Sequence, residues 1–351
     1  MRSPSLVCLL ALAAAPGSAQ DAPHASGFAT LGAGTSAAGA LDRPDPVARL
    51  QIGADWTSTS PLSAHVHLVA RTDSLGARRG RVGVAEAYLE ANLHAAGRVR
   101  LRAGSFFLPT SFENVDALWE NPYAIASSAL NTWWGEELRP VGLDAAYYAR
   151  GLALGATVFR GNETLGALPP VRGWAIGDRW TLLGEELPVD DAVFTSVSAE
   201  NDGRLGWSAR LGWIGARLAL QYTYLDNRAD GLLYGDLRNW GTRSQVVGIG
   251  YAAGAWTVAA ENGWGPTFIA VPGRRIVSDI RAGYLLVSRR LGSHRGTVRI
   301  ESWDDGEESD TALTLAYAVV PLRAWRASVE ITLDGSDARL LAQLRYGFSI
   351  R

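Results

Sequence analysis

Apolar and polar residues alternate along most of this chain. Between positions 204 and 213 one face of the pattern holds only apolar side chains, namely Leu205, Trp207, Ala209, Leu211 and Trp213. The same period of two recurs in the segments 49–56, 62–71, 85–94, 325–333 and 339–348. A period of two predicts β-strands with one apolar and one polar face.

Three further features favour a membrane barrel over a soluble β-sandwich. The predicted strands have about 10 residues, enough to cross a bilayer when tilted, whereas sandwich strands have about 5–6. Trp and Tyr lie near the ends of the apolar faces, as Trp56, Trp256 and Trp325 do, which is typical of an interfacial girdle. Charges recur on the polar faces, where a wet lumen accepts them and a packed core does not. We therefore predict an all-β transmembrane antiparallel barrel.

The strand count has to be even if both ends of the barrel lie in the periplasm. The candidate strands are 27–34, 47–57, 62–72, 82–94, 97–107, 139–149, 152–160, 192–200, 203–213, 216–226, 243–252, 255–263, 276–289, 295–303, 310–320, 323–333 and 337–349. This set is odd. We predict about 16 strands, with 27–34 as the incomplete one; alternatively, 173–183 supplies an eighteenth strand.

Composition agrees with an exported barrel. The chain has 33 Lys+Arg against 35 Asp+Glu, a balance that argues against nucleic-acid binding. Its 39 Gly and 13 Trp accompany a mean hydropathy of +0.01, as expected when apolar and polar positions alternate. The only cysteine, Cys8, lies near the start, so no disulfide is predicted.

The first 19 residues have the pattern of a cleaved signal peptide. Arg2 gives a positive start, 6–15 is apolar, and Gly17-Ser18-Ala19 supplies small residues before the cut. The apolar run is too short to span a bilayer as a helix. We predict that residues 20–351 form the barrel, without a plug domain, after export to the outer membrane of a Gram-negative cell.

The segment 108–138 is the main candidate for a functional loop. It joins two predicted strands over about 30 residues, and loops of that length are usually functional or disordered. A short helix is expected at Ile125–Asn131. The loop also carries the candidate pore residues Glu113, Asp116, Glu120, Trp133, Trp134, Glu136 and Glu137, with Arg139 at its end. Either the loop folds into the lumen and narrows it, or it packs over the rim as a cap.

Three arginines share one face of the strand before this loop. Arg98, Arg100 and Arg102 alternate with apolar residues and form what we call the arginine ladder, which is able to guide anions. The tight turn at 95–97 brings Glu90 near Arg102 and His94 near Arg98. The ladder is therefore either an anion path or a cross-strand charge network. Because loop acids and wall bases compete, we predict weak ion selectivity.

The sequence gives little support for an enzymatic activity or a metal site. His65 and His67 share a lumen face near Glu86 and Glu90, but two His on alternate strand positions are more often wall residues than metal ligands. No phosphate-binding loop, His-Glu-x-x-His, Gly-x-Ser-x-Gly or spaced Cys pair is present. We expect no enzyme activity, no cofactor and no metal.

The pattern as a whole resembles the Gram-negative outer-membrane porins. The resemblance rests on the signal peptide, the alternating strands, the long loop after the fifth strand and an aromatic-rich last strand. It implies that Phe112–Leu138 folds inward as the constriction loop and that the protein is a homotrimer. The arginine ladder distantly resembles the phosphate-selective members. Porins usually end on Phe, whereas here Phe348 is followed by Ser349-Ile350-Arg351.

These observations predict a transport channel. The expected function is passive diffusion of small hydrophilic solutes, with outer-membrane lipid, lipopolysaccharide and the barrel-assembly machinery as partners. A structural, adhesive or secretion-associated barrel is the alternative, followed by a barrel enzyme acting on lipids or peptides, which would need a His paired with Ser or Asp at the rim.

Overall fold

A computed structural model describes most of the mature chain. The described residues are 23–36, 45–57, 61–72, 77–94, 97–113, 118, 121–135, 139, 141–161, 181–190, 193–196, 199–232, 239–271, 274–322, 324–335 and 337–350. The predicted signal peptide, 1–19, lies outside them. Within these ranges no helix is long and apolar enough to cross a membrane.

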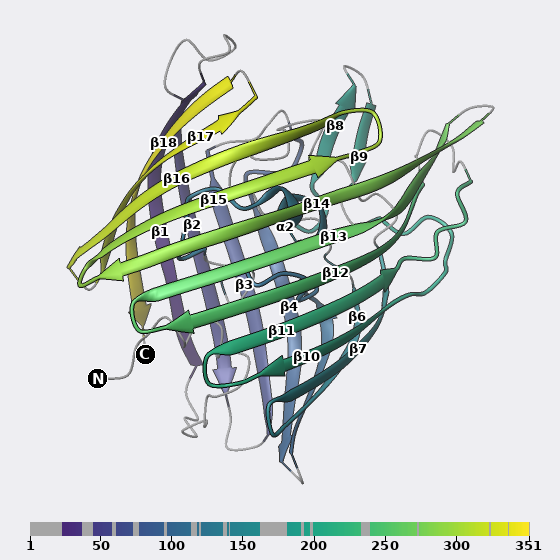
Figure 1. The fold of residues 1–351 in the computed structure, drawn as a ribbon. Helices are drawn as coiled ribbons and strands as arrows, with labels where there is room; N and C mark the ends of the chain where they lie inside the picture. The colour runs from purple at the N-terminus through teal and green to yellow at the C-terminus, as the bar shows by residue number, and fades with distance from the viewer. Residues whose placement is uncertain are drawn as a thin grey trace.

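Sixteen antiparallel strands of the described chain close into one barrel (Figure 1). The first eight are β1 (Pro23–Ser36), β2 (Asp45–Thr57), β3 (Leu62–Arg71), β4 (Val82–His94), β5 (Arg98–Ser105), β6 (Val141–Ala149), β7 (Leu152–Arg160) and β10 (Gly206–Ile214). The other eight are β11 (Leu218–Asp226), β12 (Trp240–Ala253), β13 (Trp256–Val271), β14 (Arg274–Leu291), β15 (His294–Asp304), β16 (Ser309–Leu322), β17 (Trp325–Asp334) and β18 (Asp337–Ile350). The predicted fold class is confirmed.

Consecutive barrel strands pair with each other, β7 pairing with β10 past a separate two-stranded sheet, and β1 closes the ring by pairing with β18. Connections are short at one end, as at 150–151, 254–255 and 292–293, and long at the other, as at 106–140 and 161–205. Outer-membrane barrels place short turns in the periplasm and long loops outside. We name the two ends accordingly. The start of β1 and the end of β18 both lie at the periplasmic end.

The predicted number of 16 strands is correct, but the reason given for it is wrong. The segment 27–34 belongs to a full strand, β1, which pairs with both β2 and β18. The surplus candidate is 192–200. There, among the described residues, β9 (Val193–Ser196) pairs with β8 (Glu186–Asp190) in a two-stranded sheet outside the barrel ring. Of the alternative strand 173–183, residues 173–180 lie outside the described part.

The two faces of the wall follow the predicted alternation. Leu340, Leu344 and Tyr346 on β18 are 52%, 43% and 41% exposed, as expected for side chains that face lipid. On the inner face, Arg345 lies over the Phe28 ring of β1. The alternation predicted for 339–348 is thereby confirmed.

This register predicts an asymmetric effect of charge. Leu344→Arg places a guanidinium in the lipid-facing band and should lower the free energy of unfolding by about 2–4 kcal/mol. Gln343→Arg, on the luminal face of the same strand, should change it far less. Unfolding by urea in lipid vesicles measures both. Equal losses in the two variants would contradict the assignment of faces.

Candidate functional site

The loop that follows β5 folds back into the barrel. Its short helix α2 (Ala129–Trp134) lies against the inner wall at β13, β14 and β15 (Figure 1). Ser128 caps this helix: its hydroxyl accepts a hydrogen bond from the Asn131 amide at 3.2 Å. A serine cap fixes where a helix begins, so the helix starts four residues later than the predicted Ile125–Asn131. The inward fold is confirmed, and the alternative of a cap over the rim is wrong.

Two tryptophans hold the loop against the wall. Trp133 and Trp134 are only 3% and 1% exposed and belong to a buried cluster with residues of the loop base and the wall, including Phe106, Leu108, Leu130, Val246, Ile280, Tyr284 and Trp303. The wall is shaped for them, since a Cβ at Gly263 would lie 2.7 Å from the Trp134 ring. Both indoles therefore lie behind the loop and do not line the open lumen.

Three glutamates on the wall accept hydrogen bonds from the loop backbone. Glu261 on β13 accepts from the Phe112 amide at 2.9 Å and from the Ser111 hydroxyl at 2.7 Å. Glu330 on β17 accepts from the amides of Ile125 at 2.6 Å and Ala126 at 3.2 Å. Glu301 on β15 accepts from the Ala129 amide at 2.7 Å. Each carboxylate thus satisfies loop amides that would otherwise be buried without acceptors.

Arg299 on β15 lies at the centre of these acids. It is fully buried, lies 3.0 Å from Glu301 and 3.4 Å from Glu113 of the loop, and donates to the carbonyls of Ala126 at 2.8 Å and Ser127 at 3.0 Å. A buried guanidinium needs such compensation, because removing it from water is costly. We call Glu113, Glu261, Arg299, Glu301 and Glu330 the loop anchor.

The predicted pore acid Glu113 is a structural residue in this arrangement. Its carboxylate accepts from the Ser128 hydroxyl at 2.5 Å and from the Ser128 amide at 3.0 Å. Burial raises the pKa of Glu113, while Arg299 and the Ser128 hydrogen bonds act to lower it. Arg139, at the other end of the loop, is fully buried and donates to the Thr181 carbonyl. Asp116, Glu120, Glu136 and Glu137 lie outside the described residues.

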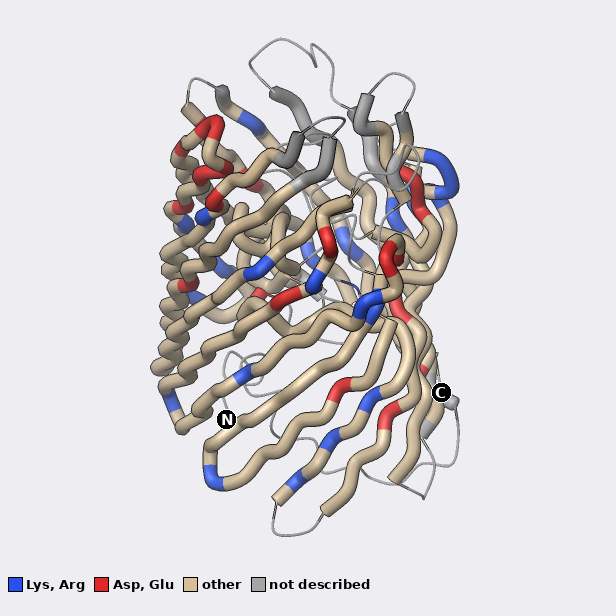
Figure 2. Tube along the Cα trace, turned by 90° about the vertical axis from the view of Figure 1, so that its right-hand side faces the viewer, with Lys and Arg blue, Asp and Glu red and all other residues tan. Residues whose placement is uncertain are grey.

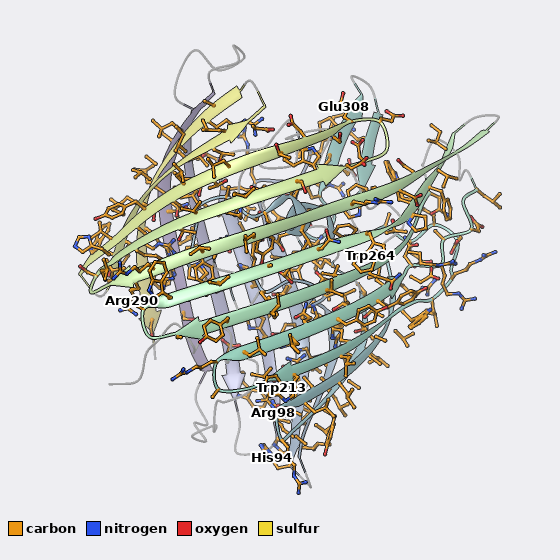
Figure 3. The ribbon with its side chains drawn as sticks, viewed as in Figure 1. His94, Arg98, Trp213, Trp264, Arg290 and Glu308 are labelled. Atoms are coloured by element: carbon orange, nitrogen blue, oxygen red, sulfur yellow. The ribbon has the colours of Figure 1, made fainter. Side chains whose placement is uncertain are left out.

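The arginine ladder is a cross-strand network. Arg102 pairs with Glu90 at 2.7 Å, and Arg100 pairs with Asp144 of β6 at 3.3 Å. Arg98 lies directly opposite His94, as predicted (Figure 3). The Arg98 guanidinium lies over the Tyr148 ring. Figure 2 shows basic and acidic positions interspersed on the strands that face the viewer. Of the two interpretations, the structure favours the charge network.

The paired histidines also have partners in the wall. His65 Nδ1 lies 2.6 Å from a carboxylate oxygen of Asp55, and His67 Nε2 lies 2.7 Å from the side-chain oxygen of Gln51. His67 Nδ1 is 3.9 Å from Glu86. The described residues contain no group of three or more His, Cys, Asp or Glu arranged to hold a metal ion.

A second outer loop reaches the mouth of the barrel. In its described part, 181–190, Glu185 pairs with Arg71 of β3 at 2.8 Å, with neither side chain exposed. Leu182 packs with Val69, Ala85 and Phe107. Neither this contact nor the anchor residues on β13, β15 and β17 were predicted from the sequence. The only sign of the anchor residues in the sequence was a glutamate at an inward-facing position of a predicted strand, as at Glu261, Glu301 and Glu330.

No protein-family model and no curated protein matches the sequence of this chain. Comparison with solved structures finds proteins with a similar fold. OmpF of Salmonella typhi has a TM-score of 0.61 at 12% identity, with 93% of this chain and 97% of that chain covered. OmpT of Vibrio cholerae has 0.59 at 11%, covering 94% and 99%. A Rhodopseudomonas blastica porin variant has 0.53 at 14%, covering 93% and 100%. The chain therefore has the fold of the bacterial porins.

Proposed function

We propose that this protein is an outer-membrane porin, a passive channel for small hydrophilic solutes. The observation that carries the proposal is the position of the described parts of the loop after β5, residues 106–113 and 121–135. They lie inside a closed barrel and are fastened to β13, β15 and β17 through the loop anchor. A loop in this position reduces the cross-section of the lumen without relying on an outer lid.

The residues of the remaining wall suit passage of water and solutes. The luminal face between β2 and β6 carries Gln51, Tyr88, Arg102 and Asp144, which are polar or charged. The ladder charges are largely balanced by acids, so this wall alone gives weak ion selectivity.

The proposal extends to location and assembly. The fold supports the outer membrane as the location, and lipopolysaccharide and the barrel-assembly machinery as partners. One similar structure is described as a trimer form of OmpT, and we propose a homotrimer here as well. The proposed role is transport without catalysis.

The direct test is electrical. Purified full-length protein added to a planar bilayer in KCl should produce stepwise increases in current of uniform size, because each inserted channel adds a fixed conductance. Protein denatured before addition is the control. A folded, membrane-inserted barrel that gives no steps would contradict the proposal.

The paired ladder predicts a charge cycle. Removing one partner of the Glu90–Arg102 pair leaves the charge of the other unbalanced in the lumen. Glu90→Gln should therefore shift the zero-current potential across a KCl gradient in the direction of greater anion selectivity, and Arg102→Gln should shift it in the direction of greater cation selectivity. The double variant should match the wild type. An unchanged zero-current potential in both single variants would show that the pair does not face the conducting path.

A further inference from the structure

The periplasmic end of the barrel carries charge of one sign. None of the short segments that connect the strands at this end contains Asp or Glu. These segments are 58–61, 95–97, 150–151, 215–217, 254–255, 292–293 and 323–324. Arg150 and Arg217 lie in two of them, and Arg289 lies near the end of β14. All three side chains are exposed, and we call them the rim arginines.

The rim arginines have no acidic partner in the part of the chain that the structure describes. Arg289 lies over the Trp256 ring, with its guanidinium carbon 4.9 Å from the ring centre. Exposed arginine at the outer end of the barrel is different: Arg243 lies 3.1 Å from Asp226. The positive charge of the periplasmic rim is therefore not balanced within the protein.

Two of the rim arginines lie beside an exposed tryptophan. The amide of Ile214 donates to the Gly151 carbonyl at 2.7 Å, which makes the turns of Arg150 and Arg217 neighbours. The Trp213 indole lies against the first of these turns, since a Cβ at Gly151 would be 3.2 Å from its Nε1 atom. Trp213 is 43% exposed and lies near the periplasmic end of β10 (Figure 3). Two cationic side chains thus begin beside an apolar ring that faces lipid.

Arg289 repeats this arrangement further along the ring of strands. Its partner Trp256 is 47% exposed, and Leu291, on the same outward face of β14, is 56% exposed. Aromatic rings on the outer face of a barrel lie where the hydrocarbon meets the lipid headgroups. An arginine at this level covers apolar surface with its methylene groups and keeps its charge among the headgroups. The rim arginines therefore lie at the level of lipid phosphates.

We propose that the rim arginines bind the phosphate groups of anionic glycerophospholipids, such as phosphatidylglycerol, in the inner leaflet of the outer membrane. Guanidinium groups form charge-assisted and often bidentate hydrogen bonds with phosphate oxygens. A lipid fits better than an anionic polymer of the periplasm, because the acyl chains also cover Trp213, Trp256 and Leu291. The inference rests on the proposed location in the outer membrane and is independent of conduction.

The test compares two lipids that differ in headgroup charge. Full-length protein in detergent is titrated with phosphatidylglycerol or phosphatidylcholine carrying the same acyl chains, and native mass spectrometry counts the bound lipid. The wild type should bind phosphatidylglycerol at least about tenfold more tightly, since each arginine near an anionic headgroup contributes about fivefold. In the rim variant, Arg150→Gln with Arg217→Gln and Arg289→Gln, the two affinities should agree within about twofold.

The matched control removes three exposed arginines from the outer end of the barrel. Arg204→Gln with Arg228→Gln and Arg243→Gln changes the net charge by the same amount. This control should keep the wild-type preference within about twofold. Both variants are checked for folding by the heat resistance of the barrel in gel electrophoresis. A folded rim variant that keeps the wild-type preference overturns the proposal, and so does a wild type that has no preference.

Two further measurements separate the competing explanations. Isolated peptidoglycan is sedimented with each protein in the same detergent. If the wild type binds it, the rim variant does not, and neither prefers phosphatidylglycerol, the rim is a site for the polymer and the lipid proposal is overturned.

Current steps in planar bilayers report on the channel separately. A wild type that prefers phosphatidylglycerol but gives no steps supports the lipid site and contradicts the channel. A wild type that gives steps but has no lipid preference overturns the lipid site alone.

Discussion

Deletion of residues 121–135, with a short Gly-Ser link in their place, is expected to raise the single-channel conductance several-fold. The segment includes α2 and the backbone amides held by Glu330 and Glu301. Its removal takes the inward-folded part of the loop out of the lumen, and conductance grows with the area of the narrowest section. The barrel strands are untouched, so the variant should still insert into membranes.

The control for this deletion is a change in a neighbouring outer loop. Replacing β9 (Val193–Ser196) by a Gly-Ser link removes residues that, in the described part of the chain, pair with β8 outside the barrel ring. This control should leave the conductance close to that of the wild type. The two variants are compared by step size in planar bilayers. An unchanged step size in the 121–135 deletion, with normal insertion, would place the narrowest section elsewhere.

The barrel was predictable because its pattern is local. Along most strands apolar residues face outward and polar residues face inward, so the sides of residues such as Leu344 and Arg345 can be assigned without any long-range information. The segment 192–200 was misassigned for the same reason. It has the composition of a strand, but in the described part of the chain it pairs with the neighbouring β8 in a local hairpin. The sequence pattern does not distinguish such a hairpin from a strand of the barrel.

The inward fold of the loop was also predictable in outline. Trp133 and Trp134 within a long loop required burial somewhere, and the structure buries both. Their contacts were not predictable. Glu261 meets Phe112 across 149 positions and Glu330 meets Ile125 across 205. A period of two shows that these glutamates face inward, but it does not show which loop amides they meet.

Replacement of Arg299 by Met should release the constriction loop. Arg299 is the cation of the loop anchor and lies between Glu301 and Glu113, with no exposed surface. Methionine fills much of the same volume but leaves these carboxylates without a counter-charge. Removal of one partner from a buried ion pair typically costs about 3–5 kcal/mol. We expect this loss to fall on the docking of the loop, since the strands remain hydrogen-bonded to each other.

Hydrogen exchange measures that docking directly. In the wild type, the amides of Ile125 and Ala126 donate to Glu330 and should exchange slowly. In Arg299→Met they should exchange at least about a hundredfold faster, because 1.4 kcal/mol corresponds to a factor of ten. Arg295→Met is the matched control. It removes a charge from the same face of the same strand, where Arg295 contacts the Ser288 hydroxyl and the Tyr123 ring. Equal protection of Ile125 and Ala126 in both variants would mean that Arg299 does not hold the loop, which would then be held by the buried tryptophans and by the hydrogen bonds to the wall glutamates.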